Sequence, residues 1–354
     1  MKILIAPDSF KGSMTAETVA DTISKAIGDN AQCRCLPLSD GGEGFCKAVY
    51  GACGGEMVSV KCHDIYYNEI EAKVLVLDDT AVVECAAASG LQPKKRVVLS
   101  SSYGTGELIK YAAEQGCKHI VLGLGGTGCC DGGIGALTAL GAKFYDENQN
   151  VMQRPKSNDM NFVFGMNVRD CIRGFDITYA CDVENTYYGK DGAAYVFAAQ
   201  KGANKTQVQE LDEGLQRVNA FFSNSVANVK GAGAAGGICG GLYSVYGGKI
   251  ESGFDILSRF YSLDEKIKQA DVVITGEGKT DTQTLMGKAP FRLAELCKKY
   301  GKKCVVISGS IDGVKLGDEM LSLVDDEITA DEAIKHGSDV LYKKVQKSLE
   351  IILK

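Results

Sequence analysis

The sequence has no long apolar run, and this absence removes a class of protein. No stretch approaches the roughly 18 consecutive apolar residues that a membrane-spanning helix needs. The first residues also reach Pro7 and Asp8 too early for a secretory signal. We therefore expect a cytoplasmic protein with no membrane partner.

Histidines are few, and cysteines lack the paired spacing of metal sites. The three histidines, His63, His119 and His336, belong to no HExxH pair and accompany no GxSxG serine, which argues against zinc proteolysis and triad hydrolysis. The 14 cysteines include no CxxC pair, so a structural metal site is not expected. We expect free thiols, because thiols stay reduced in the cytoplasm. A net charge of -6 offers no basic field for a nucleic acid.

Glycine, by contrast, is abundant. The chain has 354 residues, 43 of them glycine. That length exceeds what one hydrophobic core usually organises, so two lobes are expected. The glycine count is well above average usage and predicts many tight loops whose backbone can approach a ligand closely.

The apolar pattern predicts an α/β fold. Short apolar strands followed by a loop and a helix are typical of a parallel sheet, and this order occurs near both ends of the chain, with strands at 2–6, 33–38, 271–275 and 303–308 and helices at 289–300 and 339–353. Residues 56–60, 69–77 and 81–86 form strand patterns without intervening helices, which favours antiparallel pairing. We predict a Rossmann-like parallel-sheet domain formed by residues 1–62 and 268–354, with a second mixed α/β domain, residues 63–267, inserted within it and carrying the glycine-rich loops. The residues alone do not assign segment 95–145 to either lobe.

One glycine loop keeps an oxidoreductase open as an alternative. Residues 123–128, GLGGTG, satisfy GxGxxG, and Asp146 stands about where a ribose-binding carboxylate would lie. However, the loop continues into Cys129, Cys130 and Asp131, so no helix follows the third glycine directly. A carboxylate at 131 suits a metal-chelated phosphate better than a bare pyrophosphate.

A second loop has the ending of a P-loop without its beginning. Residues 272–281, VVITGEGKTD, end in GKT, but the first glycine of a Walker A motif would fall on Val273, inside a strand. Its chemistry is still that of an anion site, because glycines admit the anion, Lys279 and Lys288 can neutralise phosphate charge, and Asp281 can reach Mg²⁺. A purely structural turn is the alternative.

Taken together, these segments resemble the glycerate kinase family of the bacterial sugar-acid pathway type over nearly the whole chain. The resemblance is carried, in order, by APDSFKGS at 6–13, DGGEG at 40–44, GTGELI at 104–109, GLGGTGCCDGG at 123–133, ACDVEN at 180–185, QKGA at 200–203, GAGAAGG at 231–237 and TGEGKTD at 275–281. It implies ATP-dependent phosphorylation of D-glycerate, usually to 2-phosphoglycerate. Lys279 stands where the family typically has arginine; it keeps the charge but loses the bidentate fork.

Within this hypothesis, each candidate residue has an expected role. The ATP phosphates would be bound by backbone donors of the loop and by two lysines, namely Gly125, Gly126, Thr127, Gly128, Lys279 and Lys288. Asp131 or Asp281 would hold Mg²⁺. Lys11 with Ser9 would grip the glycerate carboxylate, and Asp182 would orient or deprotonate the attacking hydroxyl, with Asp8 and Asp40 as competing carboxylates. A non-catalytic nucleotide-binding regulatory protein is a further alternative, and a monomer or homodimer is expected.

Overall fold

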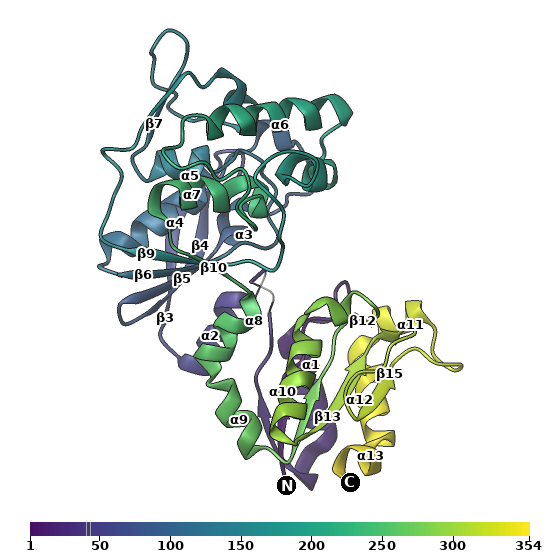
Figure 1. The fold of residues 1–354 in the computed structure, drawn as a ribbon. Coiled ribbons are helices and arrows are strands. Elements are labelled where there is room, and N and C mark those ends of the chain that lie inside the picture. The colour runs from purple at the N-terminus through teal and green to yellow at the C-terminus, as the bar shows by residue number, and fades with distance from the viewer. Residues whose placement is uncertain (40, 43) are drawn as a thin grey trace. The chain divides into compact units, whose positions relative to one another are not determined.

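The computed structural model describes residues 1–39, 41–42 and 44–354. The chain divides into two compact units, each with its own core. The first unit comprises Met1–Asp40, Lys47–Cys53 and Phe254–Lys354, and the second comprises Gly41–Cys46 and Gly54–Gly253. Each unit is described by itself (Figure 1).

The first unit is built on a five-stranded parallel sheet. Its strand order is β15 (Glu319–Ser322), β13 (Lys303–Ser308), β11 (Val272–Thr275), β1 (Lys2–Ile5) and β2 (Gln32–Cys35). A two-stranded pair, β12 (Lys279–Thr280) and β14 (Ser310–Ile311), lies beside the loops that follow β11 and β13. The helices are α1 (Ala16–Ile27), α8 (Gly253–Tyr261), α9 (Leu263–Gln269), α10 (Ala289–Tyr300), α11 (Ala330–Lys335), α12 (Gly337–Lys347) and α13 (Leu349–Leu353), with α2 (Phe45–Cys53) contributing its residues from 47 onward.

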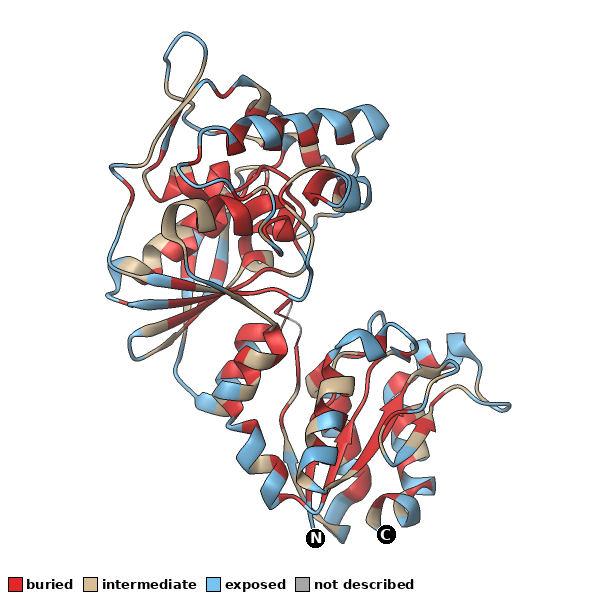
Figure 2. Ribbon diagram, viewed as in Figure 1, coloured by how far each residue is buried: buried red, intermediate tan, exposed pale blue. Residues whose placement is uncertain are grey.

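The strands of this sheet are buried on both faces, as parallel sheets usually are. Ile3 and Ile5 join the same core cluster as Val19 of α1 and Leu341 of α12. Because side chains alternate along a strand, Leu4 points to the opposite face, and it too is buried. Figure 2 shows the central strands in the buried colour and the outer faces of the helices exposed.

The second unit contains a six-stranded mixed sheet in the order β10 (Lys249–Glu251), β9 (Asp176–Ala180), β6 (His119–Gly123), β5 (Thr80–Glu84), β4 (Glu69–Leu77) and β3 (Glu56–His63). Strands β3, β4 and β5 pair antiparallel, whereas β5, β6, β9 and β10 pair parallel. Helices α3 (Cys85–Ser89), α4 (Tyr103–Glu114), α5 (Ile134–Ala139), α6 (Lys205–Asn219) and α7 (Ile238–Tyr246) complete the unit with a small hairpin of β7 (Lys143–Tyr145) and β8 (Gly165–Asn167). Segment 95–145 belongs to this unit.

The predicted fold class is confirmed: a parallel-sheet unit carries a mixed α/β unit inserted within it. Several bounds differ from the expectation, two of them at elements of the first unit. Strand β2 ends at Cys35, although Leu36 and Leu38 still donate backbone hydrogen bonds to Ile5 and Pro7, and the helix expected over 339–353 is interrupted at Ser348, between α12 and α13. The domain boundaries expected after 62 and before 268 stay a prediction. No helix within the described ranges has both the length and the apolarity to cross a membrane.

Candidate active site

In the first unit, three loops meet at the carboxyl edge of the parallel sheet. They follow β1, β11 and β13, and backbone hydrogen bonds join them: Asp8 N donates to Gly276 O at 2.8 Å, and Gly309 N donates to Glu277 O at 3.1 Å. A Cβ added to Gly278 would lie 3.2 Å from the backbone nitrogen of Lys11. Ligands of open α/β sheets bind at this edge, so these loops form a candidate binding site of the first unit.

The 8–11 segment does not cap the helix that follows it, because another residue does so. The N-cap of α1 is Thr15, whose hydroxyl accepts from Thr18 N at 3.2 Å. Asp8 is half-buried and its Oδ1 accepts from Ser9 N at 2.6 Å, whereas the side chain of Lys11 is exposed. Asp8, Ser9 and Lys11 therefore all lie in the loop after β1; Asp40 lies outside the described residues.

A buried carboxylate in the β11 loop was given no role by the sequence. Glu277 is 6% exposed, and its Oε1 accepts from Thr284 Oγ1 at 2.6 Å while its Oε2 lies 3.3 Å from Lys288 Nζ. Lys288 therefore already has a carboxylate partner within the chain. The only sequence signal for Glu277 was its position between two glycines, Gly276 and Gly278.

Lys279 and Asp281 lie at the surface of the same loop. Lys279 Nζ is 3.0 Å from Asp312 Oδ2 and 3.7 Å from Asp281 Oδ2. The hydrogen bond with Asp312 raises the pKa of Lys279 above its ordinary value. Asp281 also accepts from Gln283 N at 2.9 Å through Oδ1. Lys279 thus stands between two carboxylates, and phosphate binding by it would compete with both.

The second unit has a corresponding edge, where the parallel strands β5, β6 and β9 end. The chain passes close to it: Gly125 N donates to Gly41 O at 3.2 Å. A Cβ at Gly125 would overlap the Cα of Gly42, and one at Gly41 would lie 2.9 Å from Ala180 O. Glycine is required at both positions because the backbones touch.

Two of the four backbone amides of residues 125–128 donate hydrogen bonds within the described chain. Gly125 N donates to Gly41 O, and Gly128 N donates to Ser89 O at 2.8 Å. The amides of Gly126 and Thr127 donate to no residue that the structure describes. Gly126 is exposed and has a φ of 76°. Of the four predicted backbone donors, these two remain available to a ligand.

Asp131 is the most enclosed of the candidate residues. It is fully buried; its Oδ2 accepts from Ser102 N at 2.7 Å, Ser102 Oγ at 2.8 Å and Gly135 N at 3.2 Å, and its Oδ1 accepts from Gly133 N at 3.0 Å. Burial raises the pKa of this carboxyl above 3.8, and the four hydrogen bonds offset part of that rise. These contacts support a part in holding the loop; a role as a metal ligand stays a prediction.

Asp182 is in the opposite situation. It follows β9 at the carboxyl edge, its side chain is exposed, and Gly253 N lies 3.2 Å and 3.3 Å from its two carboxylate oxygens. An exposed carboxylate at the end of a parallel strand can reach a ligand, and backbone donation holds it in place. Asp182 therefore fits the position that a general base or orienting group needs.

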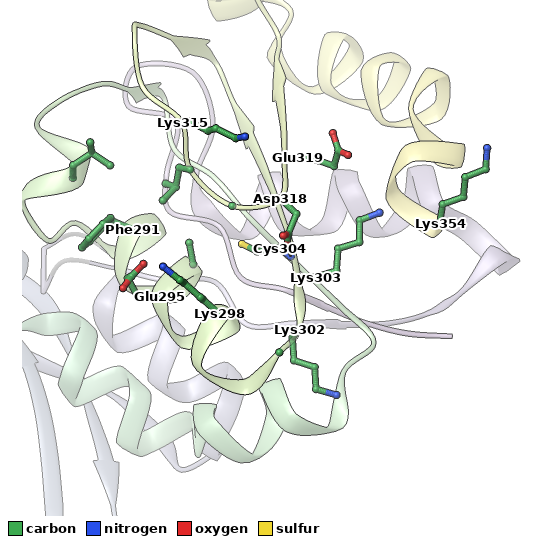
Figure 3. A pocket seen from close by; sticks show the side chains of 15 residues that line it. Phe291, Glu295, Lys298, Lys302, Lys303, Cys304, Lys315, Asp318, Glu319 and Lys354 are labelled. Atoms are coloured by element: carbon green, nitrogen blue, oxygen red, sulfur yellow. Dashed lines mark hydrogen bonds between the residues drawn. The ribbon is translucent and has the colours of Figure 1, made fainter.

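The first unit also has a large pocket, which lies away from the carboxyl edge of its sheet. It has a volume of about 980 Å³ and is lined by several lysines, among them Lys298 and Lys315 (Figure 3). Its walls are the start of β13, the start of β15 and the end of α10, which is the amino edge of the sheet. A helix C-terminus disfavours an anion, and Glu295, Asp318 and Glu319 share the lining. We do not assign the chemistry to it.

The described residues hold no cluster of three or more histidine, cysteine or acidic side chains able to bind a metal. This finding does not bear on magnesium bound with a nucleotide, since Mg²⁺ is commonly held by one or two carboxylates together with substrate phosphates. Within the described chain, the cysteines are free thiols; burial raises the pKa of Cys130 to about 12.

Comparison with known proteins identifies relatives over the whole length. The model of the glycerate kinase family matches residues 3–353. The glycerate kinase of Halalkalibacterium halodurans is 36% identical, covering 96% of this chain and 95% of its own, and the glycerate 2-kinase of Escherichia coli K12 is also 36% identical, covering 96% and 94%. The crystal structure of a candidate glycerate kinase 2 from Salmonella typhimurium LT2 superposes with a TM-score of 0.86 at 34% identity, covering 99% of this chain and 98% of that one.

These relatives give no support to the oxidoreductase or to the regulatory protein. The structure adds a reason against a dinucleotide fold at 123–128. The helix α5 begins only at Ile134, six residues after Gly128, so the third glycine does not open the helix whose N-terminus would bind a pyrophosphate.

Proposed function

Since the chain belongs to the glycerate kinase family, we propose that this kinase transfers the γ-phosphoryl group of ATP to the 2-hydroxyl of D-glycerate. The observation that carries the proposal is the family match over residues 3–353. Membership of a kinase family implies that ATP is used. The position of phosphorylation is suggested by the E. coli relative, which is named glycerate 2-kinase.

The loop of the second unit suits the phosphates of a nucleotide. The amides of Gly126 and Thr127 are uncommitted among the described residues, and backbone N–H groups in a glycine-rich turn are good anion donors. In the first unit, Lys279 and Lys288 would offset negative charge, although each already contacts a carboxylate. Magnesium, when bound, would neutralise charge on the phosphates, with Asp281 as the accessible candidate ligand.

The acceptor would be held by the 8–11 segment. Lys11 is exposed and carries the charge that a glycerate carboxylate needs, Ser9 can donate a hydrogen bond, and Asp8 is fixed by Ser9 N. Asp182 would accept the proton of the attacking hydroxyl, because its carboxylate is exposed. Phosphoryl transfer requires chiefly positioning and charge stabilisation, so a base of ordinary strength suffices.

The test is an assay that couples ADP release to NADH oxidation. Release that depends on both D-glycerate and Mg²⁺ is the expected result, and ³¹P and ¹³C NMR of the product would assign the phosphorylated carbon. ADP release without D-glycerate, or no release with any small hydroxy acid, would overturn the proposal. A cytoplasmic location, a monomer or homodimer, and the lack of nucleic-acid binding stay predictions from the sequence.

A further inference from the structure

A lysine in the second unit is buried beside the 125–128 loop. Lys201 ends a short turn, Ala199–Lys201, that directly follows a π-helix at Ala194–Ala198. It is only 4% exposed. Lysine is almost never this buried unless its charge is paired, and π-helical turns occur often at functional sites.

The contacts of Lys201 are all to the glycine loop and all uncharged. Its Nζ donates to Cys129 O at 2.7 Å and to Thr127 Oγ1 at 3.2 Å. No carboxylate of the described chain forms an ion pair with it. An ammonium has three donors, so one of them has no acceptor among the described residues.

No neighbouring group that the structure describes forms a direct ion pair with the ammonium. Asp131, the acidic residue next along the loop, directs its two carboxylate oxygens to Ser102, Gly133 and Gly135 rather than to Lys201. The nearby thiols of Cys129 and Cys130 are buried, and burial raises their pKa above the ordinary value, so they are neutral near pH 7. A buried charge with only neutral partners is costly.

This cost is offset if an anion binds at the loop. The residue that Lys201 contacts, Thr127, also has one of the two uncommitted amides. Three donors therefore lie at or next to Thr127: its own amide, the amide of Gly126, and the ammonium of Lys201, which contacts its hydroxyl. Backbone and cationic donors in one loop are the usual composition of an anion site.

On this basis we infer that Lys201 is a further anion-binding residue of the enzyme, supplying the positive charge with which the 125–128 loop binds the anionic oxygens of a phosphoryl group or a carboxylate. The inference rests on the proposed function only in that these two anions are the ones present in the reaction. A lysine that merely fastened the loop would need its two hydrogen bonds but not its charge.

Two variants distinguish a role for the positive charge of Lys201 in binding from a role for its hydrogen bonds in holding the loop. Lys201→Met keeps the length of the side chain and removes charge and donors, whereas Lys201→Gln keeps neutral N–H donors. Lys205→Met, an exposed lysine four residues away, is the matched control. Calorimetric titration with a non-hydrolysable ATP analogue and Mg²⁺, and separately with D-glycerate, measures affinity for each anion, and circular dichroism checks folding.

We expect both Lys201 variants to lose about 100-fold in affinity for one ligand and to retain the other, which is the upper range for losing one hydrogen bond between charged groups. The weakened ligand identifies which anion the loop binds, because a collapsed loop would weaken both. Lys205→Met should match the wild type.

The inference is overturned if Lys201→Gln binds both ligands as tightly as the wild type, or if neither Lys201 variant folds, since the charge would then serve the fold alone. Should only Lys201→Met fail to fold, the glutamine variant decides. A wild-type protein that binds the analogue in a Lys201-dependent way but never phosphorylates glycerate would refute the proposed reaction and leave this inference standing.

Discussion

Replacing Asp131 with alanine should be among the most damaging single changes to the second unit. The substitution removes the acceptor of three backbone amides, those of Ser102, Gly133 and Gly135, at a position that is fully buried. Each buried donor left without a partner costs about 1–3 kcal/mol. Three of them give roughly 3–9 kcal/mol, and water entering the vacated space brings the expected loss to about 3–5 kcal/mol.

The assay is urea unfolding followed by circular dichroism, combined with hydrogen exchange of the 102–135 segment. Asp131→Ala should lower the unfolding midpoint and make the amides of Gly133 and Gly135 exchange rapidly. Asp146→Ala is the matched control, because Asp146 accepts hydrogen bonds from Asn148 N and Asn150 N in an exposed turn where water can replace it. Equal, small losses in both variants would refute the claim that burial makes these bonds costly to lose.

The same residue predicts a pH dependence. Burial raises the pKa of Asp131 in the folded state. A raised pKa contributes stability that is fully present below the unfolded pKa, about 3.9, and is lost as the pH rises through the folded value. The stability of the wild type relative to Asp131→Asn should therefore fall as the pH rises above about 4. A difference that grows with pH would show that the hydrogen bonds outweigh burial.

Two further predictions concern glycine packing and catalysis. Gly276→Ala should destabilise the first unit by several kcal/mol, because the new Cβ would overlap the carbonyl oxygen of Ile307. The control is Gly51→Ala, in open space on a helix, which should stabilise the protein by about 0.5–1 kcal/mol. Equal urea midpoints in the two variants would contradict the packing argument. Asp182→Asn and Lys11→Ala should each lower kcat/KM at least ~100-fold with an unchanged melting temperature, and full activity in both variants of the coupled assay would remove the site assignment.

The elements whose ends are marked by proline, glycine or polar turns could be predicted from the sequence. Helix α10 was expected over 289–300 and occupies those residues. Pro290 fits the first turn of a helix, and Gly301 takes the left-handed conformation, with φ of 62°, that ends one. Strands β4 and β13 also matched residue for residue, because alternating or continuous apolar runs between polar turns leave little choice of bounds.

The site was harder to predict, because burial depends on contacts distant in sequence. Asp131 was expected as a candidate ligand of Mg²⁺, and that stays a prediction, but the sequence does not show that Ser102, 29 positions earlier, donates to its carboxylate. Lys201 had no assigned role, because nothing local shows that its side chain runs inward to Thr127, 74 positions away. The available signal was the segment QKGA at 200–203, one of the segments that carry the family resemblance.

Three carboxylates beside the glycine loops differ in their burial, and this difference bears on the choice of a general base. Asp131 and Glu277 are buried, with hydrogen bonds from the chain, so taking up a substrate proton there would disrupt the bonds that shape the loops. Asp182 also accepts from a backbone amide, that of Gly253, but it is exposed at a strand end, where solvent and ligand can reach it. A general base must change its protonation in every turnover. Exposure therefore favours Asp182 over the two buried carboxylates for the proton exchange that we propose.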